Sequence, residues 1–475
     1  MPEIWAKSAA EADPEGGPRA AKAGVDLHLD LPGTHGPRGT RVRRDLEAAL
    51  RDAVRTGRLG PGTRLPSSRA LAADLGLARN TVAEVYSQLV AEGWLTARTG
   101  SGTSVADRRA VDPHPSPLAR PEVAVPRYDL RPGVPDLSAF PAGAWLATAR
   151  KVLASAPRQL LDYPDPRGLP QLRAVLAGYL ARARGVAADP GRIVICAGFA
   201  HGLAVTCAAL REAGAATMAV EAYGHQAHRD LAEAQGLRLR PLPVDGSGAV
   251  IGDAAGADAA LLTPAHQFPL GVTLHPQRRR EAARWGGVVI EDDYDGEFRY
   301  DRQPVGALQA LAPDHVVYAG TASKSLAPTL RLGWLVVPPR LLDAVAAQLT
   351  AGPSGLDQLT LAEFIDSGGY DRQIRRTRLG YRRRRDRLAA ALRRQGRHVT
   401  GIAAGLHAVL DVPRADTERQ LITRAAGHGL ALQGLESFRV PGTSADRAGL
   451  VIGYGRPPEH AYTTALARLC AVLDR

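Results

Sequence analysis

Apolar residues recur every three to four positions in the first hundred residues, and this spacing predicts short amphipathic helices. From Thr40 onward, Val42, Leu46, Leu50 and Val54 share one helical face. The pattern stops at TGRLGPGTRLP, a stretch rich in turn-forming residues. The first predicted helix therefore ends before this stretch.

Two more helices and a hairpin are predicted directly after it. SSRALAADLG predicts a helix that is capped by Ser67 or Ser68 and ends at Gly76. ARNTVAEVYSQLVAEGWL predicts a third helix with an apolar face of Val82, Val85, Tyr86 and Leu89. LTARTGSGTSVA predicts two short strands around a Gly/Ser turn. Three helices and a hairpin in about 65 residues outline a winged helix-turn-helix.

Beyond residue 128, apolar strand candidates alternate with helical segments rich in Ala, Leu and Arg. The candidates are RIVICAG, TMAVE, LRLRPLPV, AALLTP, GVVIEDDY, HVVYAG and RLGWLVVP. This alternation predicts an α/β domain with a large, mostly parallel sheet.

From about Leu359 the pattern changes again. A long basic helical segment, DRQIRRTRLGYRRRRDRLAAAL, precedes the strand candidates GLHAVLDV and GLVIGYG. These segments predict a smaller C-terminal α+β subdomain. The four consecutive arginines at 382–385 are interpreted as a solvated helix face in preference to a second nucleic-acid patch.

The chain of 475 residues is therefore predicted to have four parts. Residues 1–37 lack periodicity and predict a flexible tail. Residues 38–106 form the winged helix, the proline-rich residues 107–127 a linker, and residues 128–475 the α/β domain. No apolar run approaches the roughly 20 residues that span a bilayer, and the N-terminus lacks a signal-peptide pattern. We therefore expect a cytoplasmic protein without a membrane partner.

The distribution of charge along the chain indicates what kind of partner the protein could bind. The chain has 60 Lys and Arg against 48 Asp and Glu, a net charge of +12. Residues 38–109 hold 13 arginines and 7 carboxylates, a net charge of +6. This concentration fits either a polyanionic partner or a basic solvated face.

A sequence resemblance decides between these two interpretations. RLPSSRALAADLGLARNTVAEVYSQLVAEGWLTARTGSGTSVA resembles the GntR family of bacterial repressors along its whole DNA-binding domain. The resemblance implies double-stranded operator DNA as the partner, and short polar and Arg side chains suit phosphates and base edges. The implied contacts are Ser67, Ser68, Arg69, Arg79, Asn80 and Thr81, with Arg98, Gly100 and Gly102 on the wing.

Lysine is rare in this chain, which makes Lys324 a candidate for specific chemistry. The other lysines are Lys7, Lys22 and Lys151. Lys324 follows small hydroxyl residues at the end of a strand candidate, in GTASKSLAPTL. A guanidinium stays protonated and is no nucleophile, whereas a partly desolvated amine attacks an aldehyde. Position 324 is therefore a candidate Schiff-base amine.

Other segments supply groups that pyridoxal phosphate would need. In VVIEDDYDGEF, Asp292 and Tyr294 are two residues apart, so they are predicted to share one face of a strand. The carboxylate suits the pyridinium nitrogen and the phenol suits the ring oxygen.

Two further segments suit the phosphate of such a cofactor. In CAGFAHGL, Gly198 ends a strand, and Phe199 and Ala200 open a helix with free amides. Near the lysine, an anionic group would meet Thr321, Ser323 and Arg331.

The order of these segments resembles the fold-type I aminotransferases across residues 128–475, including DLRPGVPDLSAFP and DYPDPRGLPQLRAVLAGYL. The resemblance implies an internal aldimine at Lys324, His225 stacked on the cofactor ring, and no metal. It also implies a homodimer in which Tyr163 reaches the phosphate bound by the partner subunit. With its GntR-type winged helix, the chain is identified as a member of the MocR subfamily. These are transcription factors whose aminotransferase-like domain binds pyridoxal phosphate as effector or sensor.

Two departures from the aminotransferase pattern favour a sensor over an active enzyme. TPAHQFPLG places Phe268 where transaminases carry an Asn that bonds the ring oxygen, a change typical of the regulators. Val451 occupies the position of the arginine that grips a substrate carboxylate, with Arg439 or Arg456 as candidate substitutes.

The sequence therefore predicts a pyridoxal-phosphate-dependent DNA-binding transcriptional regulator and not an enzyme. The alternative is an active aminotransferase with an N-terminal appendage. Two kinds of effector fit: pyridoxal phosphate alone, as in control of vitamin B6 synthesis, or the cofactor together with a small amine or amino acid.

Overall fold

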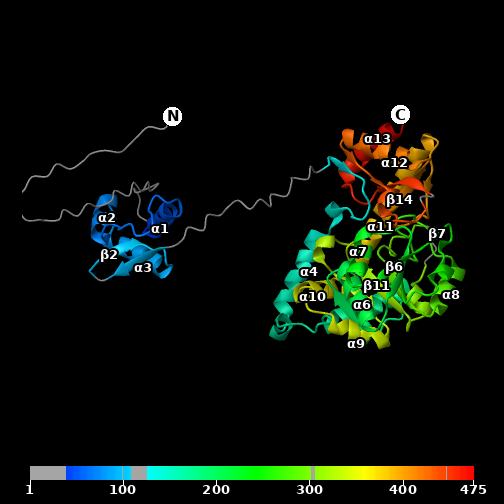
Figure 1. Cartoon of the computed structure of the whole chain (residues 1–475), viewed down its shortest axis with the longest axis horizontal. Coiled ribbons are helices and arrows are strands. Elements are labelled where there is room, and N and C mark those ends of the chain that lie inside the picture. The colour runs from blue at the N-terminus through cyan, green and yellow to red at the C-terminus, as the bar shows by residue number, and fades with distance from the viewer. Residues whose placement is uncertain (1–38, 99, 108–125, 301–304, 445–446, 475) are drawn as a thin grey trace, which may run out of the picture. The chain divides into compact units, whose positions relative to one another are not determined.

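The computed structural model describes residues 39–98, 100–107, 126–300, 305–444 and 447–474. The chain divides into two compact units, Met1–Val123 and Ala124–Arg475 (Figure 1). The predicted tail and nearly all of the predicted linker lie outside the described residues.

The first unit contains the predicted three helices and hairpin. Its elements are α1 (Gly39–Arg55), α2 (Ser68–Leu75), α3 (Arg79–Ala91), β1 (Leu95–Arg98) and β2 (Gly102–Val105). The predicted cap is confirmed at Ser67, whose Oγ accepts a 3.2 Å hydrogen bond from the Ala70 amide. Gly76 ends α2 with φ of 65°, a left-handed conformation that glycine adopts without strain.

An apolar core and a few polar bonds hold this unit together. The core residues are Leu46, Leu50, Leu71, Val82, Val85, Leu89, Leu95 and Val105. Arg51 of α1 forms a 2.8 Å ion pair with Glu92, which follows α3. The Tyr86 hydroxyl donates a 3.0 Å hydrogen bond to the Pro66 carbonyl, so α3 also fixes the segment that leads into α2.

The second unit is built on a seven-stranded sheet. In spatial order its strands are β4 (Ile193–Cys196), β12 (Gly333–Val336), β11 (Val316–Thr321), β10 (Val288–Asp292), β9 (Ala259–Leu262), β5 (Thr217–Glu221) and β6 (Arg238–Leu242). β12 runs antiparallel to both neighbours, and the other pairs are parallel. All seven predicted strand segments lie in this one sheet, which confirms the large, mostly parallel sheet.

Helices cover this sheet on both faces. They are α5 (Pro170–Arg184), α6 (Phe199–Glu212), α7 (Gln226–Ala234), α8 (Pro276–Arg284), α9 (Pro339–Ala347) and α10 (Gly355–Asp366). α4 (Ala142–Ser155) packs on α10. Alternate strand residues pack into separate apolar layers: Ile290 lies in a cluster with residues of α6 and α9, whereas Val289 packs in another with residues of α8. The sheet is therefore the buried middle layer of three.

The C-terminal elements form a smaller α+β region at one end of this unit (Figure 1). They are α11 (Gly369–Arg394), β13 (Val399–Thr400), β14 (His407–Val412), α12 (Ala415–Gly427), β15 (Leu430–Ala431), β16 (Gln433–Gly434), β17 (Ala448–Gly453) and α13 (Glu459–Leu473). Four of the strands form a sheet in the order β13-β14-β17-β16. β15 pairs instead with β3 (Tyr128–Asp129), so the start of the unit packs on its C-terminal region. Among the described residues, no helix is long and apolar enough to cross a membrane.

One arginine of the 382–385 run is buried, which corrects the interpretation of the whole run as a solvated face. Arg384 is 3% exposed and pairs with Asp136 at 2.6 Å and with Glu459 at 2.9 Å. It also donates a 2.7 Å hydrogen bond to the Pro457 carbonyl. Because Asp136 precedes α4 and Glu459 begins α13, this guanidinium joins three distant segments of the chain.

Replacing Arg384 with methionine should therefore destabilise the second unit strongly. Removing one partner of a buried ion pair costs about 3–5 kcal/mol, because the remaining charge stays buried without compensation. Arg383→Met is the matched control, since Arg383 is exposed, and its change should stay within about 0.5 kcal/mol. Urea unfolding followed by tryptophan fluorescence measures both. Equal losses would contradict the assigned role of Arg384.

Candidate functional site

A pocket of about 270 Å³ opens where the carboxyl ends of β4, β10 and β11 meet. This edge of a parallel sheet is the usual place for a ligand in α/β proteins. Ten residues singled out from the sequence line it: Gly198, Phe199, Ala200, His225, Asp292, Tyr294, Thr321, Ser323, Lys324 and Arg331. Segments that are more than a hundred residues apart in the sequence therefore meet at one site.

Lys324 lies in the turn that follows β11. Its Nζ donates a 2.8 Å hydrogen bond to the Gly133 carbonyl. Burial lowers the pKa of the Lys324 ammonium, while the carboxylates of Asp292 and Asp295 oppose this shift. The amine therefore loses its proton more readily than an exposed lysine, as a nucleophile requires.

Asp292 ends β10 and points into the pocket. Burial raises the pKa of its carboxyl well above the usual range, and Lys324 opposes the shift. Its Oδ1 is buried and has no hydrogen-bond partner in the described chain. Asp293 faces away, where its carboxylate accepts bonds from Arg184 Nε at 2.7 Å and from the Tyr318 hydroxyl at 2.8 Å. The alternation predicted for this strand therefore holds at Asp292 and Asp293.

Tyr294 lines the same pocket, although it lies beyond the end of β10 at Asp292. The prediction that Asp292 and Tyr294 share one face of a strand is therefore wrong in its detail. The Tyr294 hydroxyl lies 3.0 Å from Nδ1 of His266, which also lies 2.8 Å from Oδ2 of Asp295. These contacts fix the direction of the phenol.

A second group of lining residues supplies donors for an anion. Gly198 has φ of 81° and leads into the first turn of α6, whose amides point outward from the helix end. A methyl group on Gly198 would lie 3.4 Å from Nη1 of Arg331, so the guanidinium sits directly against this turn. Thr321 Oγ1 donates a 2.9 Å hydrogen bond to Oγ of Ser323. Amides, hydroxyls and a guanidinium thus converge as in known phosphate sites.

An aromatic wall closes a further side. The rings of His225 and Phe268 stack, with centroids 4.2 Å apart and planes inclined by 11°. His228 and His407 also line the pocket, and sequence reasoning missed both. His228 lies one helical turn after His225, a spacing that could have identified it. His407 is a polar residue at the start of β14, a strand that also contains the exposed Asp411, so its signal is weaker.

The remaining lining residues are neutral, and sequence reasoning missed these as well. They are Gly133, Val134, Pro328 and Leu406. Gly133 belongs to DLRPGVP, a segment that contributed to the family resemblance but not to the predicted site. Its place in the pocket depends on packing across the unit.

Four further residues considered from the sequence do not line the pocket. Tyr163 is 99% exposed on the surface. Val451 is buried in β17. Arg439 pairs with Glu436 at 2.5 Å, and Arg456 pairs with Asp129 at 3.0 Å. Neither arginine is therefore positioned to replace the carboxylate clamp.

In the first unit, the candidate DNA contacts lie on three neighbouring features. Ser67, Ser68 and Arg69 begin α2, Arg79, Asn80 and Thr81 begin α3, and Arg98, Gly100 and Gly102 lie on the hairpin. Arg69, Arg79 and Arg98 are exposed, and none of them forms an ion pair with another described residue. Gly100 and Gly102 both have φ of 84°, which favours glycine at the hairpin tip.

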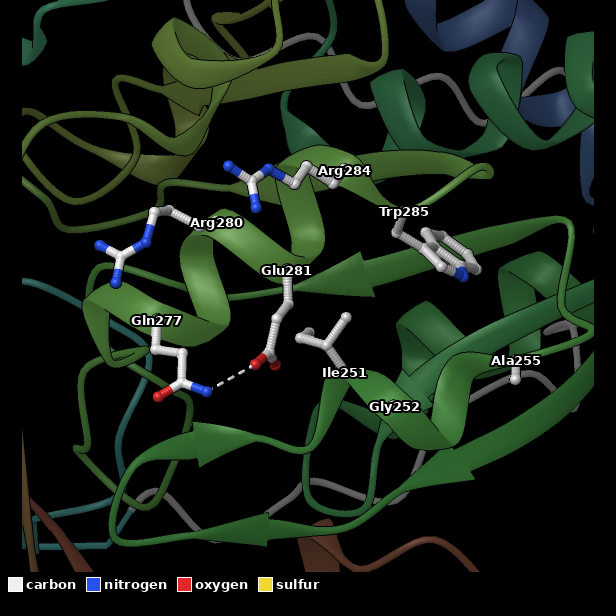
Figure 2. A pocket seen from close by; sticks show the side chains of 8 residues that line it. All are labelled: Ile251, Gly252, Ala255, Gln277, Arg280, Glu281, Arg284 and Trp285. Atoms are coloured by element: carbon white, nitrogen blue, oxygen red, sulfur yellow. Dashed lines mark hydrogen bonds between the residues drawn. The ribbon is translucent and has the colours of Figure 1, made fainter.

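A larger cleft of about 470 Å³ lies elsewhere, between α8 and the short helix η4 (Ile251–Ala254) (Figure 2). Gln277 and Glu281 are joined there by a 3.0 Å hydrogen bond, and Trp285 forms one wall. None of the residues predicted from the sequence lies in this cleft. In the part of the chain that is described, no cluster of three or more His, Cys, Asp or Glu could hold a metal ion.

Comparisons with known proteins identify relatives of both units. Residues 43–105 match the gntR family of bacterial regulatory proteins, and residues 132–447 match aminotransferase class I and II. The HTH-type pyridoxine biosynthesis transcriptional regulator PdxR of Corynebacterium glutamicum is 34% identical over 94% of this chain and 98% of its own length. The probable rhizopine catabolism regulatory protein MocR of Rhizobium meliloti is 33% identical over 87% of this chain and 90% of its own length.

Solved structures resemble the second unit in fold. An archaeal alanine:glyoxylate aminotransferase has a TM-score of 0.65 and 22% identity, covering 74% of this chain and 91% of that chain. Aspartate aminotransferase of Thermus thermophilus with maleate has a TM-score of 0.62 and 20% identity, covering 73% of this chain and 92% of that chain. At these identities the likeness concerns the fold alone.

The two histidines at the aromatic wall should stay neutral well below pH 7. Burial lowers the pKa of His225 to about 4 and that of His228 to about 3, and the charge of Lys324 adds to both shifts. Unfolded histidine titrates near pH 6.5, so the folded state binds fewer protons and loses stability as the pH falls below about 6.5.

Nuclear magnetic resonance of protein labelled with ¹³C at histidine Cε1 measures these pKa values. His225→Phe and His228→Phe variants assign the two signals. We expect neither signal to move between pH 8 and pH 5. A midpoint between pH 6 and 7 for either ring would show that the wall is open to water.

Proposed function

Because the chain belongs to the MocR-type family of HTH-type transcriptional regulators, in which a gntR-type domain is joined to an aminotransferase class I and II domain, we propose that pyridoxal phosphate is its effector. The chain is a transcriptional regulator. In this proposal residues 38–106 bind operator DNA, and residues 128–475 bind the cofactor and form a homodimer. Occupancy of the pocket by the cofactor shifts the affinity of the regulator for its operator.

The assignment of pyridoxal phosphate as the cofactor rests on one observation. The buried Oδ1 of Asp292 has no partner in the described chain, and it lies in the same pocket as the Lys324 amine. An unpaired buried carboxyl oxygen is costly, and a protonated pyridine nitrogen would satisfy it. The Lys324 amine, with its lowered pKa, supplies the nucleophile for an aldehyde.

The other lining residues fit the remaining groups of the cofactor. The first amides of α6, Ser323 and Arg331 would bind its phosphate, and Tyr294 its ring oxygen. His225, backed by the ring of Phe268, would face the pyridine ring. When bound, pyridoxal phosphate supplies an aldehyde and a ring that accepts electrons. In a dimer, the exposed Tyr163 would reach the pocket of the partner.

The lining of the pocket favours pyridoxal phosphate alone over an added amino acid. Among the described residues that line the pocket, the only lysine is Lys324 and the only arginine is Arg331. Both are assigned to the cofactor. The other lining residues include Val134, Leu406 and His407. Burial keeps the pKa of His407 well below its usual value, so this ring is neutral. A second carboxylate would therefore find no cation there.

Sequence identity to named relatives does not distinguish between the two kinds of effector. PdxR, named for pyridoxine biosynthesis, is 34% identical to this chain, and MocR, named for rhizopine catabolism, is 33% identical. The choice between the two effectors therefore rests on the described lining residues, which offer no cation beyond Lys324 and Arg331. We infer control of vitamin B6 metabolism in preference to control of amine catabolism.

Lys324→Ala should remove covalent cofactor binding. Added pyridoxal phosphate should give the wild type a visible absorption band and an adduct that borohydride traps, because the amine of Lys324 is the nucleophile. Lys151→Ala is the matched control, since Lys151 is exposed on α4 and pairs with Glu363. It should behave as the wild type. A trapped adduct in the Lys324→Ala protein would assign the nucleophile to another residue.

Arg79→Ala should weaken operator binding while the visible band of the cofactor stays unchanged. Arg79 is exposed at the start of α3, where a guanidinium can contact phosphates or base edges. Each lost phosphate contact lowers the slope of log affinity against log salt by about 0.9. Fluorescence anisotropy on the upstream region of the regulator's own gene measures this affinity. Arg58→Ala, in the same unit, should change it less than about twofold, and equal losses would refute the role of α3.

A further inference from the structure

The excess positive charge of this chain is concentrated in two places. The net charge of the chain is +12, and residues 38–109 contribute +6 of it. Helix α11 contains 11 arginines and 2 aspartates in 26 residues, a net charge of +9. The remainder of the chain is therefore negative, with a net charge of −3. A general preference for arginine does not explain this distribution, because it would spread the charge evenly.

The exposed arginines of α11 lie on one face, which we call the α11 stripe. Its members are Arg372, Arg375, Arg376, Arg382, Arg383, Arg387, Arg393 and Arg394. Their spacing follows the helical repeat, so they form a continuous band about 33 Å long, at 1.5 Å per residue. Of the two aspartates of α11, Asp386 is exposed and Asp371 is half-buried. Asp386 lies 4.0 Å from Arg382.

Four of these eight arginines have partners in the fold, among them Arg387, which lies 4.0 Å from Glu459 and donates to Thr463. Arg375, Arg383, Arg393 and Arg394 have no hydrogen-bond or ion-pair partner among the described residues. Arg372 donates to the neutral Ser367 carbonyl at 3.2 Å, and Arg376 to the Ala139 carbonyl at 2.7 Å. Like charges three or four residues apart destabilise a helix. The stripe therefore opposes folding slightly unless an anion neutralises it.

We propose that the α11 stripe binds the phosphate backbone of DNA. The chain is a DNA-binding regulator, so the polyanion is already its partner. Guanidinium groups bind phosphates in a bidentate manner, and the stripe is about as long as one turn of B-DNA, roughly 34 Å. Because phosphates carry no sequence information, a contact between the stripe and the phosphate backbone is independent of DNA sequence. For the exposed arginines of the 382–385 run, this proposal favours a nucleic-acid patch over a solvated face, and it does not depend on the cofactor.

The test removes the four arginines without partners and compares salt dependence. The variant combines Arg375→Gln, Arg383→Gln, Arg393→Gln and Arg394→Gln in the full chain. The matched control combines Arg238→Gln, Arg280→Gln, Arg284→Gln and Arg340→Gln, which are exposed arginines of the same unit outside α11. Both variants lose the same net charge. Affinity for a long fragment of the upstream region is measured by anisotropy from about 50 to 200 mM salt.

We expect the α11 variant to reduce the slope of log affinity against log salt by about 3 to 4, since each phosphate contributes about 0.9. At the lowest salt its affinity should fall at least about tenfold, whereas the control stays within about threefold. Both variants should keep the visible band of bound pyridoxal phosphate. This separates the result from the proposed cofactor role, because that role is tested by the band and by the response of DNA affinity to added cofactor in the wild type.

Two outcomes would overturn the proposal. Equal effects of the two variants on the slope would mean that net charge alone matters. An unchanged slope with a changed oligomeric state in analytical ultracentrifugation would identify the α11 stripe as an interface between copies of this chain.

Discussion

The site depends on the placement of one amine and one carboxyl group at the edge of a buried parallel sheet. β10 and β11 are adjacent, with Asp292 opposite Ala319, and Lys324 follows five residues later in the turn. This register brings both groups into one pocket, while Asp293 faces the other side and binds Arg184. Burial disfavours both charges, so the amine tends to lose its proton and the acid to keep its own. A ligand with an aldehyde and a basic ring nitrogen suits this pair.

The residues around Lys324 and Asp292 favour a sensor over an active aminotransferase. By resemblance, Phe268 stands where a transaminase would offer an amide to the ring oxygen, and its ring stacks on that of His225. By resemblance, Val451 stands at the position of the carboxylate clamp. It is buried in its strand, and the two arginines considered as substitutes are paired elsewhere. We therefore propose that the pocket holds a cofactor but does not orient an amino-acid substrate. Binding energy is then available to shift a conformational equilibrium.

The sequence predicted features that depend on local pattern. Alternation placed all seven strands, and helical spacing and capping placed the three helices of the first unit. The chemistry of short segments, with the family resemblance for His225, selected ten residues that meet in one pocket. It did not predict features that depend on distant partners. Arg384 is buried because Asp136, nearly 250 residues earlier in the chain, meets it in space. His407 reaches the pocket through the packing of β14, and Tyr294 lies past the strand because β10 ends at Asp292.

The central claim is that occupancy of the Lys324 pocket changes the interaction of the regulator with DNA. A titration of pyridoxal phosphate against operator affinity, on wild type and Lys324→Ala protein side by side, tests it most directly. The account predicts that the wild type changes its affinity severalfold as its visible band saturates, because the cofactor binds the two states unequally. The Lys324→Ala protein should bind DNA but not respond. A wild type whose affinity and footprint ignore the cofactor while the band saturates would contradict the account.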